Sequence, residues 1–282
     1  MNRVALALLF AFACKPAQPS EGASPAPAAP PAASAQDAGP SAAPLRVGAT
    51  AIPHADMLRA VAPELKAQGV NLDIRLYNDY GRPNTDVANG ALDANFFQTE
   101  PYLWRWRAAH MQPLVVVGRI HVEPMGVYSR KMKPTDDLSK IREGAIVALP
   151  DDPSNLGRAL FLLQKAGILQ LDERRGLDAV RSDITANPHK LRFRELPAAR
   201  MADQLSSADL VVMNGNFALE ARLGAEQALY REGSDSPFPN VLVARDELQT
   251  DARVRALLAA LRGPTAQKLL LEKYAGEALP AQ

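Results

Sequence analysis

Cysteine is almost absent from this chain of 282 residues, and the single one, Cys14, lies close to the amino terminus. An intrachain disulfide is therefore impossible, and no cysteine nucleophile can lie in the globular part. The formal net charge is only +1. Because a face that binds phosphates normally shows as a basic excess, we expect no nucleic-acid partner.

Motifs of metal-dependent and hydrolytic enzymes are missing too. The four histidines, His54, His110, His121 and His189, lie far apart in the sequence and form no pair with metal-ligand spacing. No Gly-x-Ser-x-Gly elbow and no glycine-rich phosphate loop occurs. We therefore expect no metal site, no cofactor and no catalytic residue, and we interpret each histidine as a helix cap or a surface residue.

The amino terminus is typical of a secreted lipoprotein. The apolar run of residues 4–13 is too short to span a bilayer and predicts a signal peptide over residues 1–13. Cys14 follows directly and is predicted as a lipidation site that carries an acyl group such as palmitate. Ala11 and Phe12 are unusual for such a signal, so a plain signal peptide and a free thiol remain the alternative.

The next segment is rich in Ala, Pro, Ser and Gly. Residues 14–44 contain too few apolar side chains to offset the entropy cost of ordering. They predict a disordered tether of up to about 90 Å between a membrane anchor and the globular part. An unconstrained terminal tail is the alternative. No later run is long and apolar enough to cross a membrane, so we expect a lipid-anchored protein of the cell envelope that faces the periplasm.

Strands and helices alternate from Leu45 onward. The predicted strands cover residues 45–50, 71–77, 93–97, 114–117, 145–149, 190–196, 209–213 and 240–245. The predicted helices cover residues 54–66, 84–88, 99–109, 153–166, 198–205, 217–223 and 251–274. This βαβα pattern predicts an α/β fold with parallel-type sheets covered by helices on both faces, and its two successive units suggest two lobes.

The most informative segment joins the strand at residues 145–149 to the following helix. Pro153 suits the first helical position, and Asp152 or Ser154 can cap the free amides. Asn155 and Arg158 are three residues apart and share one face of the first turns. Free N–H groups beside a guanidinium suit a carboxylate ligand, although an ordinary capped helix with a surface arginine is the alternative.

Polar clusters follow four of the predicted strands. They are Asn78–Tyr80, Gln98–Thr99, Asp152–Asn155 and Asn214–Asn216. In open α/β sheets, ligands bind outside the carboxyl ends of the strands. Each cluster alone is an ordinary turn, but four clusters at equivalent places in both units predict a shared binding cleft.

Short motifs in a fixed order carry a resemblance to a known family. The motifs are Val47–Thr50 with His54-Ala55, Asn78–Tyr80 with Pro83-Asn84, Leu92–Asn95, Phe97-Gln98 with Pro101–Leu103, His121-Val122 with Pro124–Gly126 and Tyr128-Ser129, Asp152-Pro153 with Asn155 and Gly157-Arg158, Asn187-Pro188, and Asn214–Asn216. They cover most of Leu45 to Arg245. In this order they resemble the bacterial methionine-binding lipoproteins, the substrate-binding components of methionine-type ABC transporters.

The resemblance implies a two-lobed periplasmic-binding-protein fold of type II-like topology with a central cleft. The lobes would be residues 45–124 plus 238–282, and residues 125–237. A monomer would close around a free amino acid, with L-methionine as the expected ligand, and deliver it to an ABC permease driven by its ATPase.

The resemblance also implies the ligand contacts. Arg158 would pair with the ligand carboxylate, helped by Asn155, and Asn214 would contact the α-amino or carboxylate group, with Asn216 nearby. The ring walls around the thioether would be Tyr80, Phe97 and Tyr102, which suits a polarizable sulfur.

One pocket position departs from the family. The family commonly has histidine after Phe-Gln, where this chain has Thr99. Another small amino acid, or a short peptide with a methionine, therefore remains an alternative ligand. Two other functions also stay open: an enzyme that acts on an amino acid with Asp79 or Asp152 as its base, and a surface lipoprotein that serves interaction and has a vestigial ligand site.

Overall fold

A computed structural model describes residues 43–281 of the chain. The signal peptide predicted over residues 1–13, the lipidation site predicted at Cys14 and nearly all of the tether predicted over residues 14–44 lie outside the described residues. Within residues 43–281, no helix is both long enough and apolar enough to span a membrane.

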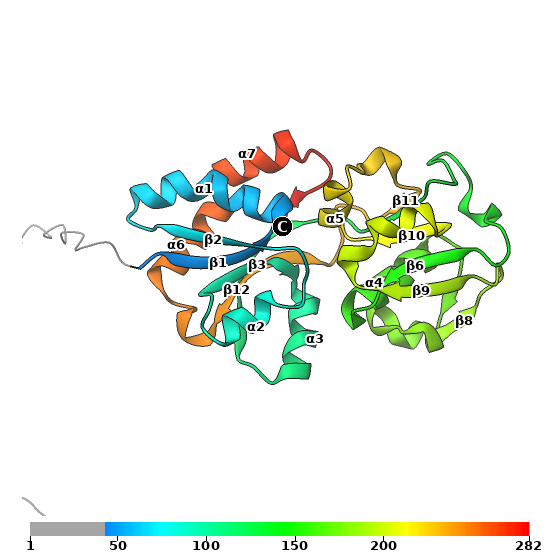
Figure 1. Cartoon of the computed structure of the whole chain (residues 1–282), viewed down its shortest axis with the longest axis horizontal. Helices are drawn as coiled ribbons and strands as arrows, with labels where there is room; N and C mark the ends of the chain where they lie inside the picture. The colour runs from blue at the N-terminus through cyan, green and yellow to red at the C-terminus, as the bar shows by residue number, and fades with distance from the viewer. Residues whose placement is uncertain (1–42, 282) are drawn as a thin grey trace, which may run out of the picture. The chain divides into compact units, whose positions relative to one another are not determined.

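Six strands form the first sheet, in the order β13-β4-β12-β3-β1-β2 (Figure 1). The strands are β1 (Leu45–Thr50), β2 (Leu72–Tyr77), β3 (Ala94–Thr99), β4 (Leu114–Val122), β12 (Pro239–Arg245) and β13 (Leu279–Pro280). β1 is parallel to β2 and β3, whereas β12 is antiparallel to β3 and β4. The sheet departs from the parallel pattern at β12, because this strand returns from the second sheet and does not follow a covering helix.

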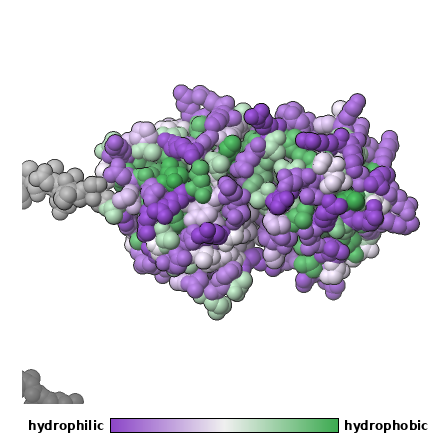
Figure 2. Space-filling view, in the orientation of Figure 1, coloured by the Kyte–Doolittle hydropathy of each residue, from purple (hydrophilic) through white to green (hydrophobic). Residues whose placement is uncertain are grey.

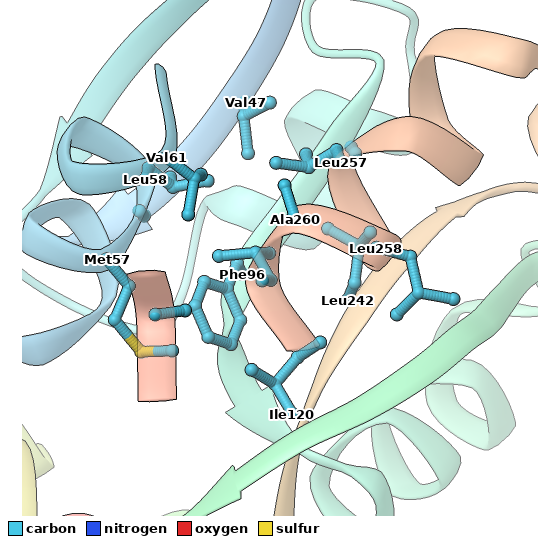
Figure 3. Close-up of a cluster of buried hydrophobic side chains, with 14 of the residues drawn as sticks. Val47, Met57, Leu58, Val61, Phe96, Ile120, Leu242, Leu257, Leu258 and Ala260 are labelled. Carbon is cyan, nitrogen blue, oxygen red and sulfur yellow. The ribbon is translucent and has the colours of Figure 1, made fainter. Parts of the chain in front are cut away.

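Helices cover both faces of the first sheet. They are α1 (Asp56–Ala67), α6 (Ala252–Arg262) and α7 (Pro264–Lys273) on one face, and α2 (Pro83–Ala88) and α3 (Glu100–His110) on the other. Phe96 lies among side chains of α1, β12 and α6 (Figure 3). The single helix predicted over residues 251–274 is wrong, since Gly263 is extended and Pro264 begins a new helix.

Five strands form the second sheet, in the order β11-β5-β10-β6-β9. They are β5 (Gly126–Tyr128), β6 (Ile146–Pro150), β9 (Arg192–Leu196), β10 (Leu210–Met213) and β11 (Tyr230–Arg231). The helices α4 (Pro153–Lys165) and α5 (Gly215–Glu220) pack on its two faces, and β7 (Gln170–Leu171) pairs with β8 (Ile184–Ala186) beside it. The α-helix predicted over residues 198–205 is wrong, because two short 3₁₀ segments occupy that stretch.

The remaining helical segments are short. They are the π-turn η1 (Ala51–Ala55) and the 3₁₀ segments η2 (Leu138–Lys140), η3 (Glu173–Asp178), η4 (Arg181–Asp183), η5 (Ala198–Arg200), η6 (Ala202–Ser206), η7 (Ala225–Gln227) and η8 (Asp246–Leu248). The face seen in Figure 2 is mainly hydrophilic, with small hydrophobic areas between the polar side chains.

The start of α4 follows from its sequence. The Asp152 carboxylate accepts the amide N–H of Asn155, and Pro153 occupies the first turn, as predicted. Gly157 allows a close approach, since a Cβ there would lie 2.2 Å from the carbonyl oxygen of Leu177. Gly167 follows the helix with a φ of +78°, which is the left-handed backbone that glycine adopts without strain.

Candidate ligand-binding site

A pocket lies where elements of the first sheet meet elements of the second. The space within it that admits a water-sized sphere is only about 20 Å³, so the pocket is narrow in this structure. Its lining residues are Tyr80, Phe97, Gln98, Thr99, Tyr102, Glu123, Asn155, Arg158, Asn214, Gly215, Asn216 and Asn240. The structure therefore brings all of the residues predicted as ligand contacts to one cavity, while their role in binding stays a prediction.

Three aromatic rings form one wall of the pocket. The ring centroids of Tyr80, Phe97 and Tyr102 lie 5.7 to 5.9 Å from one another. The Tyr80 hydroxyl donates a 2.5 Å hydrogen bond to Oδ1 of Asn216, and the ring of Tyr80 packs on Phe217 at 5.1 Å. Because Tyr80 follows β2 and Asn216 lies in α5, this contact links the structures around the two sheets. Burial raises the pKa of Tyr80 well above its usual value, so the hydroxyl keeps its proton.

Arg158 is buried beside the pocket and already has a carboxylate partner. Its Nε and Nη2 donate to the two oxygens of Glu232 at 2.8 and 2.5 Å, and Nη2 also donates to the carbonyl oxygen of Glu123 at 2.9 Å. The guanidinium carbon lies 4.2 Å from the ring centre of Phe238. Burial opposes ionisation of Glu232, but the charge of Arg158 holds the pKa of this carboxyl below its usual value. No hydrogen bond from residues 43–281 occupies Nη1 of Arg158.

A chain of hydrogen bonds fixes the orientation of the asparagines. The Asp152 carboxylate can only accept, so the Nδ2 group of Asn155 faces it at 2.9 Å. Oδ1 of Asn155 must then point the other way, where it accepts from Nδ2 of Asn214 at 2.8 Å. This leaves Oδ1 of Asn214 as an acceptor with no partner. Asn155 is thus fully engaged within the protein and positions Asn214.

Two polar atoms of the pocket are buried without a hydrogen bond in the described part of the chain. They are the acceptor Oδ1 of Asn214 and the donor Nδ2 of Asn216. Asn214 occupies the N-cap position of α5, but its side chain makes no capping bond there. A buried unpaired polar group costs about 1–3 kcal/mol, so a polar ligand that pairs with these two atoms would gain free energy there.

Two histidines that the sequence placed apart come together below the pocket. The rings of His54 and His121 are buried with centroids 5.1 Å apart, so their interpretation as isolated caps or surface residues is wrong. Both contact one oxygen of Glu123: Nε2 of His121 lies 2.5 Å and Nε2 of His54 lies 3.2 Å from Oε1. The chain folds these residues together through η1 and the end of β4, which spacing along the sequence could not indicate.

This group fits a hydrogen-bonded cluster better than a metal site. It contains two imidazoles and a carboxylate whose ligand atoms lie within 4.8 Å of one another. However, Nδ1 of His121 is buried without a partner. A metal on Nε2 would put the ring proton on that Nδ1, where the described residues offer it no acceptor.

Sequence analysis did not identify three polar residues that shape the site. Glu123 lies inside the motif from His121 to Gly126, and only this position within the motif could have indicated that it belongs to the site. Glu232 lies in a loop after β11, and Asn240 lies at the start of β12. Neither stands in a recognisable local pattern, because each reaches the site through tertiary contacts.

Comparison with known proteins now identifies the family. Residues 45–282 match the NlpA lipoprotein family. The chain is 32% identical over 249 residues to the probable D-methionine-binding lipoprotein MetQ of Pasteurella multocida, which covers 87% of this chain and 89% of that protein.

Solved structures agree with this match. A nutrient-binding protein from Burkholderia cenocepacia bound to methionine has a TM-score of 0.81 and 34% identity, covering 84% of this chain and 100% of that one. An ABC transporter periplasmic substrate-binding protein from Coxiella burnetii has a TM-score of 0.79 and 36% identity, covering 84% and 100%. The predicted periplasmic-binding-protein fold is thereby confirmed, and the chain belongs to the NlpA lipoprotein family.

Proposed function

We propose that this protein is the substrate-binding lipoprotein of an ABC importer and captures free methionine in the pocket between its two sheets. The names of its relatives support this ligand, since one is a probable D-methionine-binding lipoprotein and a solved neighbour is bound to methionine. Reversible binding of a ligand explains the polar and aromatic residues of the pocket, and we do not propose an enzymatic activity.

The observation that carries the proposal is the pair of unpaired polar atoms in the pocket. An α-amino acid has an ammonium group that donates and a carboxylate that accepts. Oδ1 of Asn214 can accept from the ammonium, while Nδ2 of Asn216 and Nη1 of Arg158 can donate to the carboxylate. The aromatic wall of Tyr80, Phe97 and Tyr102 then receives the thioether side chain, for which sulfur beside a ring contributes about 1 kcal/mol.

Closure of two lobes would couple binding to transport. We assign residues 45–124 and 238–282 to one lobe and residues 125–237 to the other, with hinges at the two crossings of the chain. A ligand that contacts Tyr80 or Phe97 on one side and Arg158 or Asn214 on the other favours the closed form, because only such differential contacts shift the balance. We further propose that an ABC permease with its ATPase recognises the closed monomer.

The same proposal covers the place of the protein in the cell. The relatives are named lipoproteins, which supports an acyl anchor at Cys14 and a position at the periplasmic face of a membrane. Labelling with a radioactive fatty acid tests this directly: the wild type should incorporate label, and Cys14→Ser should not.

Ligand-dependent stability tests the binding function. Each amino acid of a panel is added at one hundred times the dissociation constant measured for methionine. At that concentration, a ligand with the affinity of methionine raises the free energy of unfolding by about 2.7 kcal/mol, and an amino acid that does not bind leaves it unchanged. We expect that increase with methionine and none with lysine or glutamate, whose charged side chains do not suit the aromatic wall. No stabilisation by either enantiomer of methionine would contradict the proposal.

A further inference from the structure

Glu123 is a buried carboxylate that borders the pocket. Its exposed fraction is 4%, and it follows β4 at the first crossing between the sheets. Oε1 contacts the imidazoles of His54 and His121, but no hydrogen bond from residues 43–281 reaches Oε2. Such a carboxylate is costly unless charge or hydrogen bonds compensate it.

The imidazoles of His54 and His121 offer hydrogen-bond donors to the Glu123 carboxylate. Nε2 of His54 faces two acceptors, Oδ1 of Asn240 at 3.1 Å and Oε1 of Glu123, so it carries the ring proton, and Nδ1 accepts from the Thr50 hydroxyl at 2.8 Å. Burial lowers the pKa of His54 to about 4, which keeps this ring neutral at pH 7. Burial raises the pKa of Glu123, but the contacts with His54 and His121 and the charge of Arg158 together hold this pKa below its usual value.

His121 donates from Nε2 to Glu123, and its Nδ1 is buried without a hydrogen-bond partner in the described part of the chain. Arg158 is paired with Glu232 through two hydrogen bonds. In the described part of the chain, no lysine or arginine side chain donates to the Glu123 carboxylate, and Arg158 acts on it only through its charge at longer range.

Glu123 packs against the start of α5, where Asn214 carries the unpaired acceptor of the pocket. A Cβ on Gly215 would lie 2.9 Å from Cβ of Glu123, so the start of α5 packs directly on this residue. Asn214 precedes Gly215, lines the same pocket and carries the unpaired Oδ1. A small cation held between these two residues would have an amide oxygen and a carboxylate as partners.

We infer that Glu123 is the counter-charge of the ligand's α-ammonium group and makes the site specific for amines over uncharged analogues. The inference rests on the proposed function and adds a selectivity that Asn214 alone does not supply. An amide oxygen accepts equally from an ammonium or a hydroxyl, whereas a carboxylate discriminates between them by charge. His54 and His121 position the carboxylate.

A pair of ligands and a pair of variants test the inference. The ligands are L-methionine and L-2-hydroxy-4-(methylthio)butanoate, which differ only in an ammonium against a hydroxyl. Glu123→Gln keeps the shape and can still accept both imidazole N–H groups. Glu232→Gln is the matched control, because it alters the partner of Arg158 on the carboxylate side, which both ligands share. Titration calorimetry at pH 7 gives the dissociation constants, and circular dichroism checks the fold.

We expect the wild type to prefer methionine over the hydroxy acid by at least about tenfold, the value of a charge-assisted hydrogen bond of about 1.4 kcal/mol or more. Glu123→Gln should reduce this preference to less than about threefold, mainly by weakening methionine, and Glu232→Gln should leave it unchanged. Equal losses for both ligands in Glu123→Gln would assign the residue a structural role and overturn the inference.

The wild type alone decides the matter if Glu123→Gln does not fold. A preference of tenfold or more then supports the counter-charge, and nearly equal affinities contradict it. Binding of both ligands with equal strength leaves the proposed capture of methionine intact, whereas binding of neither contradicts the proposed function and the inference together. The two failures are therefore distinguishable.

Discussion

Replacement of Asn214 by alanine separates binding from folding. In the described structure, Nδ2 of Asn214 donates to Asn155, while Oδ1 is buried without a partner. The variant breaks the hydrogen bond to Asn155 and leaves Oδ1 of Asn155 buried without a donor, which costs about 1–3 kcal/mol, but it also removes the unsatisfied acceptor of Asn214, whose burial costs about the same. These effects oppose each other, so the free energy of unfolding without ligand should change by less than about 1 kcal/mol.

The effect on binding has no such compensation. An acceptor that pairs with a ligand ammonium contributes about 1.5–3 kcal/mol, so Asn214→Ala should weaken methionine binding by roughly ten- to a hundredfold. Titration calorimetry measures the affinity, and urea unfolding without ligand measures the stability. The prediction is thus a large loss of affinity at nearly constant stability.

Asn187 offers a matched control with the opposite pattern. Its Oδ1 accepts from the amide of Leu191 and its Nδ2 donates to the Leu191 carbonyl, and it does not line the pocket. Asn187→Ala should lower the free energy of unfolding by about 1–2 kcal/mol and leave the affinity unchanged. Normal methionine binding by Asn214→Ala would contradict this prediction, and so would a loss of ligand-free stability as large as that of the control.

Three further substitutions probe the site and its surroundings. Arg158→Ala should weaken binding by about 2–5 kcal/mol in calorimetry and also destabilise the protein, because Glu232 is left buried and unpaired; unchanged affinity would contradict its assignment. Burial lowers the pKa of His54 from 6.5 to about 4, so between these pH values the unfolded chain binds a proton that the folded chain does not. The free energy of unfolding therefore has its full value above pH 6.5 and falls by about 3 kcal/mol as the pH drops toward 4. His54→Gln should flatten that part of the unfolding curve, and an equally steep loss in the variant would exclude His54 as its source. Thr99→His should tighten methionine binding several-fold by adding ring contact to the thioether, whereas weaker or equal binding would show that Thr99 does not face the side chain.

Local chemistry explains which parts of the fold were predictable. Asp152, Pro153 and Gly167 each act through the backbone of their own helix, so the bounds of α4 could be predicted closely. The break at Gly263-Pro264 was equally local, but the apolar spacing on both sides of it masked the signal. The direction of β12 depends on the return of the chain from the second sheet, and the sequence contains no local sign of it.

The site was predictable to the extent that it lies at strand ends. Tyr80, Asn155 and Asn214 follow three different strands and Thr99 ends a fourth, and their meeting in one pocket follows from the general rule for α/β sheets. The partner of Arg158 could not be predicted in this way. Glu232 reaches it from 74 residues away, so only the folded chain shows that the guanidinium is already paired.

The central claim is that the pocket is built for one small zwitterion with an apolar side chain. Mass spectrometry under non-denaturing conditions, on protein purified from its native envelope without added ligand, tests this claim most directly. The account predicts a protein with a single bound molecule of the mass of methionine, which is lost in Asn214→Ala. A wild type that carries no small molecule and takes up no methionine when it is added, or one that carries a ligand without an amino group, would contradict it.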